Sequence, residues 1–395
     1  MHCATPPPAG EVWGEEPGKR DIRVLHVYRT YFPDPPGGVQ EVIRQICRST
    51  RPLGIASAVF CLSPDPDPER IDWDGTPVYR RRSWAAPASC DLGGAAAFAA
   101  FRELAMAADV IHYHYPWPFA DVLHAAAPAR IASVMTYHSD IVRQKYLYAF
   151  YKPLMWRTLS SMDRIISTSS EYARTSPVLS SERLKDRVSV IPIGLDEPYQ
   201  EQDEGIFRQV GIDRTRPYFL FVGALRYYKN LETLVRAARS VSVPVVIAGS
   251  GPSLQGLQAL AAELQASNVI FAGQVSEAQK AALMASCRAV VLPSHLRSEA
   301  FGVVLLEASR AGKAMLTCDI GTGSSHVNVH GETGLVVAPT QEALAAGLEK
   351  IIMNDELALV FGKNARKRFE DHFTAARMGA AHANEYRLIA GVQRA

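Results

Sequence analysis

The stretch VVLPSHLRSEAFGVVLLEAS, residues 290–309, carries the pattern that decides the fold. Its branched apolar start predicts a buried strand, the polar loop marks the end of that strand, and the apolar segment beyond predicts a helix. Glu299 and Glu307 stand at the two ends of that apolar segment. In isolation, the pair is best explained by one helix cap and one buried ion pair. Alternatively, each glutamate holds a different part of one long ligand, and helix N-terminal amides between them face a phosphate.

The same alternation of strand and helix recurs along the chain. Helical or loop sequence separates short apolar runs, and this predicts parallel sheets covered by helices on both faces. The predicted fold class is therefore α/β, with two doubly wound domains. The apolar runs are residues 22–28, 56–62, 109–114, 131–138, 164–170 and 187–193 in the first half, and 218–225, 244–251, 268–275, 288–294, 314–319 and 333–339 in the second half.

A break in the apolar pattern divides the chain into two parts. Residues 194–205, GLDEPYQEQDEG, combine acidic residues with proline and glycine, which predicts a linker. We expect one domain over residues 21–197 and a second over residues 198–375, followed by a helix over residues 376–395. Residues 1–20 are rich in proline, glycine and charge, and we expect them to form a disordered extension.

The bulk composition narrows the class of protein. A chain of 395 residues with 48% apolar content is expected to form two globular domains. Its formal net charge of +2 gives no broad basic field, so nucleic acid is not an expected partner. The sequence contains no run of about 18 apolar residues, the length that a membrane-spanning helix requires. The N-terminus also lacks the apolar region of a signal peptide. The six cysteines are scattered, which fits a reducing cytoplasm and no zinc site.

Two glycine-containing turns follow predicted strands. Gly37 and Gly38 lie between the first strand and the first helix, where backbone amides could approach a phosphate, but a plain tight turn explains them equally well. The segment AGSGPSLQG, residues 248–256, has Gly249 but carries Leu254 where a dinucleotide fingerprint requires its third glycine. It therefore gives only weak support for an oxidoreductase.

Charged side chains also follow predicted strands. Arg226 and Lys229 come between a strand and a helix, where two cations could neutralise a diphosphate; a solvated helix start is the alternative. His138 follows another strand, in a position typical of a cleft residue. Asp65 and Asp67 form a DxD pattern of the kind that some sugar transferases use for a metal, but three interleaved prolines favour a solvated loop. The spacing of the histidines does not indicate a metal site.

Taken together, these motifs resemble the retaining GT-B glycosyltransferases of family 4. Glu299 and Glu307, with Phe301 and Gly302 between them, match the E-x7-E signature of that family. The resemblance covers residues 22 to about 385 and implies two Rossmann-like domains that face an inter-domain cleft. Three further segments resemble the family's N-terminal glycine loop, its domain-junction motif and its late donor-domain strand: PPGGVQEVI (35–43), VIPIGLD (190–196) and GETGLVVAP (331–339).

The resemblance implies a role for each domain and each candidate residue. Residues 21–197 would bind the acceptor, residues 198–375 would bind the nucleotide-sugar donor, and the final helix would return to the first domain. Glu299 would hold donor-sugar hydroxyls and His138 would reach the sugar from the opposite domain, so these two are the catalytic candidates. Donor binding is implied for Glu307, which would hold the ribose, for Arg226 and Lys229 at the diphosphate, and for Gly37, Gly38, Gly223, Gly249, Gly273, Gln274, Val275, Phe301, Gly302 and Val303.

A narrower resemblance concerns the substrate. HVYRTYFPDPPGG (26–38) and LRYYKN (225–230) are similar to the branch that builds lipopolysaccharide O-chains from GDP-mannose or GDP-D-rhamnose. It implies a metal-independent hexosyltransferase without a cofactor, which acts on a saccharide acceptor that we expect to be lipid-linked. The chain departs from the family at Ala224, where an arginine is usual, so Arg226 would have to replace that charge.

We expect a cytoplasmic enzyme that contacts the inner face of the membrane peripherally. The segment IVRQKYLYAFYKPLMWR, residues 141–157, mixes basic and aromatic residues, although a buried core helix explains it about as well. The alternatives are a UDP-sugar-dependent transferase of the same family, a GT-B nucleotide-sugar epimerase and a non-catalytic nucleotide-sugar-binding protein.

Overall fold

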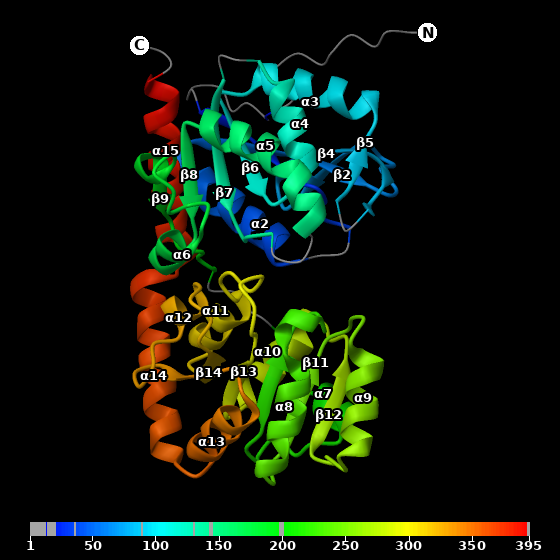
Figure 1. Cartoon of the computed structure of the whole chain (residues 1–395), viewed down its shortest axis with the longest axis vertical. Helices are drawn as coiled ribbons and strands as arrows, with labels where there is room; N and C mark the ends of the chain where they lie inside the picture. The colour runs from blue at the N-terminus through cyan, green and yellow to red at the C-terminus, as the bar shows by residue number, and fades with distance from the viewer. Residues whose placement is uncertain are drawn as a thin grey trace. The chain divides into compact units, whose positions relative to one another are not determined.

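The computed structural model describes residue 13 and residues 21–34, 37–87, 90–128, 131–141, 145–196 and 201–392, so the expectation for residues 1–20 lies outside the described residues apart from Trp13. The chain forms two compact units, and each is a sheet flanked by helices (Figure 1). The first unit contains Met1–Thr168, Ser176–Gly194 and Ala375–Ala395, and the second contains Ser169–Thr175 and Leu195–Thr374.

The first unit is built on a mostly parallel sheet with the order β3-β4-β2-β1-β6-β7-β8-β9. β3 and β5 pair antiparallel with β4 at one edge. β6 and β7 are buried along their whole length, so polar side chains on them must find partners inside the protein. The strands are β1 (Ile22–Val27), β2 (Ile55–Ser63), β3 (Arg70–Trp73), β4 (Thr76–Ala85), β5 (Leu92–Gly93), β6 (Val110–Tyr115), β7 (Ala132–Tyr137), β8 (Arg164–Ser167) and β9 (Val188–Val190).

Helices from both ends of the chain cover the sheet of the first unit. α2 (Gly38–Thr50) packs against α15 (Ala375–Val392), and α15 also contacts β1, β6 and β7. α3 (Ala95–Ala107) contacts β1 and β4, while α4 (Pro118–Ala125) packs against α5 (Lys145–Ser161). Two 3-10 turns, η1 (Arg51–Leu53) and η3 (Lys185–Arg187), complete the helical elements described in this unit.

The second unit has an all-parallel sheet with the order β12-β11-β10-β13-β14-β15. This is the doubly wound order, and its direction of winding reverses between β10 and β13. Ligands of such sheets bind beyond the carboxyl ends of the strands at that reversal. The strands are β10 (Phe219–Val222), β11 (Val245–Ala248), β12 (Val269–Gly273), β13 (Ala289–Leu292), β14 (Ala314–Cys318) and β15 (Gly334–Val337).

The helical elements of the second unit range from single turns to the 18 residues of α14. They are α6 (Ser170–Thr175), α7 (Gly205–Val210), η4 (Tyr227–Lys229), α8 (Leu231–Ala237), η5 (Ala238–Ser240), α9 (Leu254–Glu263), α10 (Glu277–Ser286), α11 (Val303–Arg310), α12 (Ser324–Val327), α13 (Gln341–Ile352) and α14 (Asp355–His372). The prediction of two doubly wound α/β domains is confirmed. None of the helices among the described residues is long and apolar enough to cross a membrane.

Candidate active site

Three glycines form one end of the second unit's sheet. Gly223 follows β10, Gly249 follows β11, and Gly273 ends β12. The backbone N–H of Gly249 donates to the carbonyl of Gly273 over 2.6 Å, and that of Gly223 donates to Ala248 over 3.0 Å. Gly249 has φ of +138°, and a Cβ there would lie 2.0 Å from the carbonyl oxygen of Gly223. Only glycine fits at this point, and the bare backbone leaves room for a ligand to approach.

Glu299 forms a buried ion pair beside these glycines. Its carboxylate accepts hydrogen bonds from the ammonium of Lys229 and from the hydroxyl of Ser294, the latter at 3.0 Å. Lys229 ends η4 after β10, and Glu299 lies in the loop after β13, so the pair spans the point where the sheet reverses its winding. Glu299 is 8% exposed and Lys229 is 9% exposed. Burial lowers the pKa of Lys229, but the Glu299 carboxylate and the Tyr228 ring outweigh it, and the net shift is upward.

The helix after this loop starts at Gly302. Gly302 has φ of +80°, and a Cβ there would lie 2.8 Å from a Leu292 methyl group, so glycine is required for both conformation and space. Phe301 is buried against Phe373. α11 begins at Val303, and the first N–H groups of a helix lack intrahelical partners and attract anions.

Glu307 lies in the middle of α11 and forms the second ion pair. Its carboxylate accepts from the ammonium of Lys280 at 2.7 Å, and Glu277 lies 2.7 Å from the same ammonium. Lys280 comes from α10, which follows the loop that carries Gln274 and Val275. Neither Glu299 nor Glu307 caps α11, so the helix-cap alternative does not describe either residue, whereas ion pairing describes both.

Arg226 differs from Lys229, although the two are close in sequence. Its side chain is exposed, and no ion pair is recorded for it among the described residues. Lys229, by contrast, forms an ion pair with Glu299. The prediction treated both cations as partners of a diphosphate. The expected role of both cations at a diphosphate stays a prediction.

The candidate residues of the first unit lie at the carboxyl ends of β1 and β7. Gly37 precedes α2 with an extended backbone, and Gly38 is the first residue of that helix. His138 follows β7, and its backbone N–H donates to the carbonyl of Tyr115 over 3.0 Å. Each of these residues therefore lies on the edge of the sheet where doubly wound folds bind ligands.

Sequence reasoning missed a cluster of buried histidines behind His138. His114 joins His26 to His138, while His112 bonds to the Tyr386 hydroxyl at 2.7 Å and to the Thr136 hydroxyl at 2.7 Å. The signal was present as H-x-H in β6, since residues two apart on a strand share a face. Asp65 and Asp67 are both exposed in the loop between β2 and β3.

Two family models together cover most of the chain and identify the class of protein. A profile described as Glycosyltransferase Family 4 matches residues 36–199, and one described as Glycosyl transferases group 1 matches residues 202–368. The chain belongs to the family 4 glycosyltransferases, and it is a GT-B enzyme. The expected family and fold are both confirmed.

Two relatives match nearly the whole chain. The chain is 44% identical to the D-rhamnosyltransferase WbpZ of Pseudomonas aeruginosa, over 90% of this chain and 93% of that one. It is 39% identical to the O-antigen chain mannosyltransferase C of Escherichia coli, over 93% of this chain and 99% of that one. The expected likeness to the O-chain mannosyl- and rhamnosyltransferase branch is confirmed.

Solved structures agree on the fold. A sucrose-phosphate synthase from Thermosynechococcus elongatus aligns with a TM-score of 0.76 at 21% identity, over 94% of this chain and all of that one. HepE of Anabaena, solved with UDP and glucose, aligns with a TM-score of 0.74 at 18% identity, over 92% of this chain and 99% of that one.

Proposed function

We propose that the chain is a retaining hexosyltransferase of O-antigen or surface-polysaccharide synthesis, which moves mannose or D-rhamnose from a GDP-sugar to a saccharide acceptor. The observation that carries the proposal is the match along nearly the whole chain to two relatives, one named a D-rhamnosyltransferase and the other an O-antigen mannosyltransferase. The chemistry of the second unit supports it, because bare strand-end glycines, a helix N-terminus and an exposed arginine suit a diphosphate.

The site residues take the following parts in this proposal. Glu299 accepts hydrogen bonds from donor-sugar hydroxyls and Glu307 from the ribose. The first amides of α11 and the Arg226 guanidinium stabilise the charge that develops on the departing diphosphate, so no metal is needed. His138 contacts the sugar from the first unit. Gln274 and Val275 border the base.

A thermal-shift panel tests the donor. A nucleotide at 100 times its dissociation constant stabilises the folded protein by about 2.7 kcal/mol. For a domain of this size that raises the melting temperature by about 5–11 °C. GDP is expected to produce this shift and UDP to produce little. A shift with UDP and none with GDP would favour the UDP-sugar alternative.

Turnover of the donor with and without acceptor tests the reaction. The purified enzyme is incubated with GDP-mannose alone and with GDP-mannose plus an O-chain saccharide primer. Sugar transfer is expected only with the primer. An epimerase would convert the donor without a primer, and a binding protein would leave the donor unchanged in both cases.

The acceptor in this proposal is lipid-linked, and the enzyme works at the inner face of the membrane, which it contacts through α5. The exposed face of α5 supports this part. Phe150 is 88% exposed and Ala149 is also exposed, which a buried core helix would not show. Val142 and Tyr146, which share this helical face in the sequence pattern, lie outside the residues whose side chains are described.

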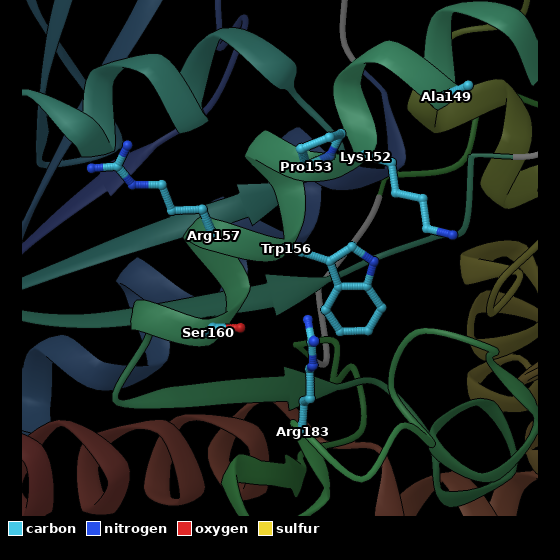
Figure 2. Close-up of a pocket in the computed structure, with 7 residues that line it drawn as sticks. All are labelled: Ala149, Lys152, Pro153, Trp156, Arg157, Ser160 and Arg183. Carbon is cyan, nitrogen blue, oxygen red and sulfur yellow. The ribbon is translucent and has the colours of Figure 1, made fainter.

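A basic pocket lies on the same helix. It has a volume of about 450 Å³ and is lined by Ala149, Lys152, Pro153, Trp156, Arg157, Ser160 and Arg183. Lys152 and Arg183 extend along the indole of Trp156, while Arg157 points away from it (Figure 2). The Arg183 guanidinium lies 5.8 Å from the centre of the indole ring. Cations beside a half-buried aromatic residue suit the charged surface of an anionic bilayer.

Vesicle co-sedimentation tests the membrane contact. The enzyme is expected to bind phosphatidylcholine vesicles that contain phosphatidylglycerol and not vesicles of phosphatidylcholine alone. The double variant Lys152→Glu, Arg183→Glu should lose this binding. Lys350→Glu, Lys363→Glu is the matched control, because it changes the charge equally at two exposed lysines of the second unit. Equal binding by both double variants would remove α5 from the proposal.

A further inference from the structure

Three buried histidines of the first unit form a hydrogen-bonded chain that ends at His138. Nδ1 of His26 lies 3.2 Å from Nε2 of His114, and Nδ1 of His114 lies 3.0 Å from Nε2 of His138. His26 and His114 have no exposed surface, and His138 is 8% exposed. The chain thus runs from the centre of the sheet to a residue at its ligand-binding edge.

The topology of the sheet builds this chain. His26 lies on β1 and His114 on β6, and these strands are parallel neighbours at the middle of the sheet, while β7, which precedes His138, is the next strand. α15 covers this face, since its Tyr386 bonds to His112 and its His382 ring lies 5.8 Å from that of His112. His26, His112 and His114 have no exposed surface, so solvent does not reach the bonds between these rings.

Only two arrangements of the N–H protons satisfy both hydrogen bonds of the histidine chain. A neutral imidazole carries one N–H and one bare nitrogen, so all three rings must donate in the same direction. Either each Nδ1 donates toward His138, or each Nε2 donates toward His26. Nε2 of His26 is buried without a partner among the described residues, so the second arrangement would leave a buried N–H unsatisfied. Orphaned buried N–H groups are rarer than under-satisfied acceptors, which favours the first arrangement.

A metal ion explains the cluster less well. Ring nitrogens of His26, His112 and His114 lie within 4.8 Å of one another, the one such group of potential ligands among the described residues. However, the rings of His112 and His114 are stacked, with centroids 4.3 Å apart and an angle of 26° between their planes. Lone pairs lie in the ring planes, so two stacked rings do not direct them at one point. Both nitrogens of His112 and of His114 are also already engaged in hydrogen bonds.

We propose that His26 and His114 are positioning residues that hold His138 in its Nδ1-protonated tautomer, so that His138 donates a hydrogen bond from Nδ1 to an oxygen of the sugar substrate. This rests on the proposed function, which places His138 against the sugar. In the first proton arrangement Nε2 of His138 accepts from His114, which leaves the proton on Nδ1. Nδ1 is also the nitrogen of His138 that takes no part in the chain.

The three hydrogen-bonded histidines are uncharged at neutral pH. The tautomer, rather than the charge, of His138 therefore decides which of its nitrogens can donate a hydrogen bond. Burial, with the neighbouring His382, lowers the pKa of His26 to about 3 and that of His138 to about 3. Burial and the other rings of the cluster lower the pKa of His114 as well. The groups that face the chain from α15 are His382 and Tyr386, and Tyr28 places its ring edge-on to His114.

Nitrogen NMR of the enzyme labelled with ¹⁵N-histidine tests the tautomers directly. The protein has 11 histidines, and each signal is assigned from its loss in the variants His26→Leu, His114→Gln and His138→Asn. In the unsubstituted enzyme, His26, His114 and His138 are expected to carry their protons on Nδ1. A proton on Nε2 of His138, or one equivalent of bound metal in the purified enzyme, would overturn the proposal. This measurement needs no substrate, so its failure is distinguishable from failure of the proposed function.

Kinetics of three variants complete the test. His114→Leu removes both bonds and should lower kcat about 10- to 100-fold, the range seen when an outer partner of a metal-bound histidine is removed. His114→Gln can accept from His26 and donate to His138, so it should restore most of kcat. His124→Leu is the matched control and should leave kcat unchanged. His124 is hydrogen-bonded to Ser161 and takes no part in the chain of three histidines.

A structural role alone would give a different result. In that case kcat would follow the fraction of folded enzyme, and the tautomer of His138 would be the same in every variant. If His114→Leu does not fold, His26→Leu provides the same comparison, because it leaves His114 in place and removes only the group that sets the direction of the chain. Unchanged kcat and an unchanged His138 tautomer in a folded His114→Leu or His26→Leu variant would refute the proposal.

Discussion

Glu299→Gln should destabilise the second unit in the absence of any ligand. The substitution keeps the size of the side chain but leaves the Lys229 ammonium without its counter-ion at 9% exposure. Breaking one side of a buried ion pair costs about 3–5 kcal/mol. At about 2–4 °C per kcal/mol for a domain of this size, the melting temperature should fall by about 6–20 °C.

Two further variants isolate the cause. Glu307→Gln should cost less, about 1 kcal/mol, because Lys280 keeps Glu277 at 2.7 Å and is less deeply buried. Lys229→Met in the Glu299→Gln background removes the uncompensated charge, so it should recover most of the lost stability. The recovered amount is the coupling free energy of a double-mutant cycle.

The assay can separate the two units. All five tryptophans, at positions 13, 73, 84, 117 and 156, belong to the first unit. Far-ultraviolet circular dichroism follows both units during heating, whereas tryptophan emission follows the first alone. A Glu299→Gln enzyme that melts within about 2 °C of the parent by circular dichroism would show that the Lys229–Glu299 contact contributes little, and the energetic reasoning above would be wrong.

The remaining predictions concern kinetics, pH and metal. At a temperature where both variants are folded, Glu299→Gln should lower kcat, because sugar contacts tighten in the transition state, while Glu307→Gln should mainly raise the donor KM; a normal kcat in folded Glu299→Gln would contradict the assigned role. Acidification from about pH 7 to pH 5.5 should destabilise the first unit by about 1 kcal/mol for each of the five histidines that are buried among its described residues. Burial holds the pKa of His26, His112, His114, His138 and His382 below the unfolded value of 6.5. Their contribution to the free energy of unfolding is therefore present above pH 6.5 and is lost as the pH falls toward the folded values. Tryptophan emission during urea unfolding at each pH measures this loss, and a stability that does not change with pH would contradict the prediction. EDTA should leave sugar transfer intact, measured as product formed before and after dialysis, whereas strict dependence on manganese or magnesium would bring Asp65 and Asp67 back as ligand candidates.

The sequence predicted the parallel strands well and the edge of the first sheet poorly. Buried parallel strands are continuous apolar runs, so the central strands are visible without a structure. β4 (Thr76–Ala85) contains three consecutive arginines and shows no such run. Its Arg80 is nevertheless buried, because it donates to the Ser63 hydroxyl at 3.0 Å and to backbone carbonyls of the β2–β3 loop. Such partners depend on tertiary structure, so local pattern cannot reveal them.

The sequence likewise predicted one part of the candidate site and missed another. Spacing placed Glu299 and Lys229 at the ends of strands, and the doubly wound order brings those ends together. Their ion pair joins residues 70 positions apart, and no local feature of the sequence identifies it. The partners of His138 were missed for the same reason, since His26 is 88 residues from His114 and the two meet only through strand pairing.

The path of the backbone has a consequence for synthesis of the protein. The chain passes between the two units after residues 168, 175, 194 and 374, so the first unit includes Ala375–Ala395, which the ribosome makes after every residue of the second unit. All residues of the second unit have been made before α15 exists. Units generally fold as their residues emerge, so the unit encoded second can finish first, while the sheet face that α15 covers stays open. A chain that stopped at residue 374 would contain every residue of the second unit and an incomplete first one.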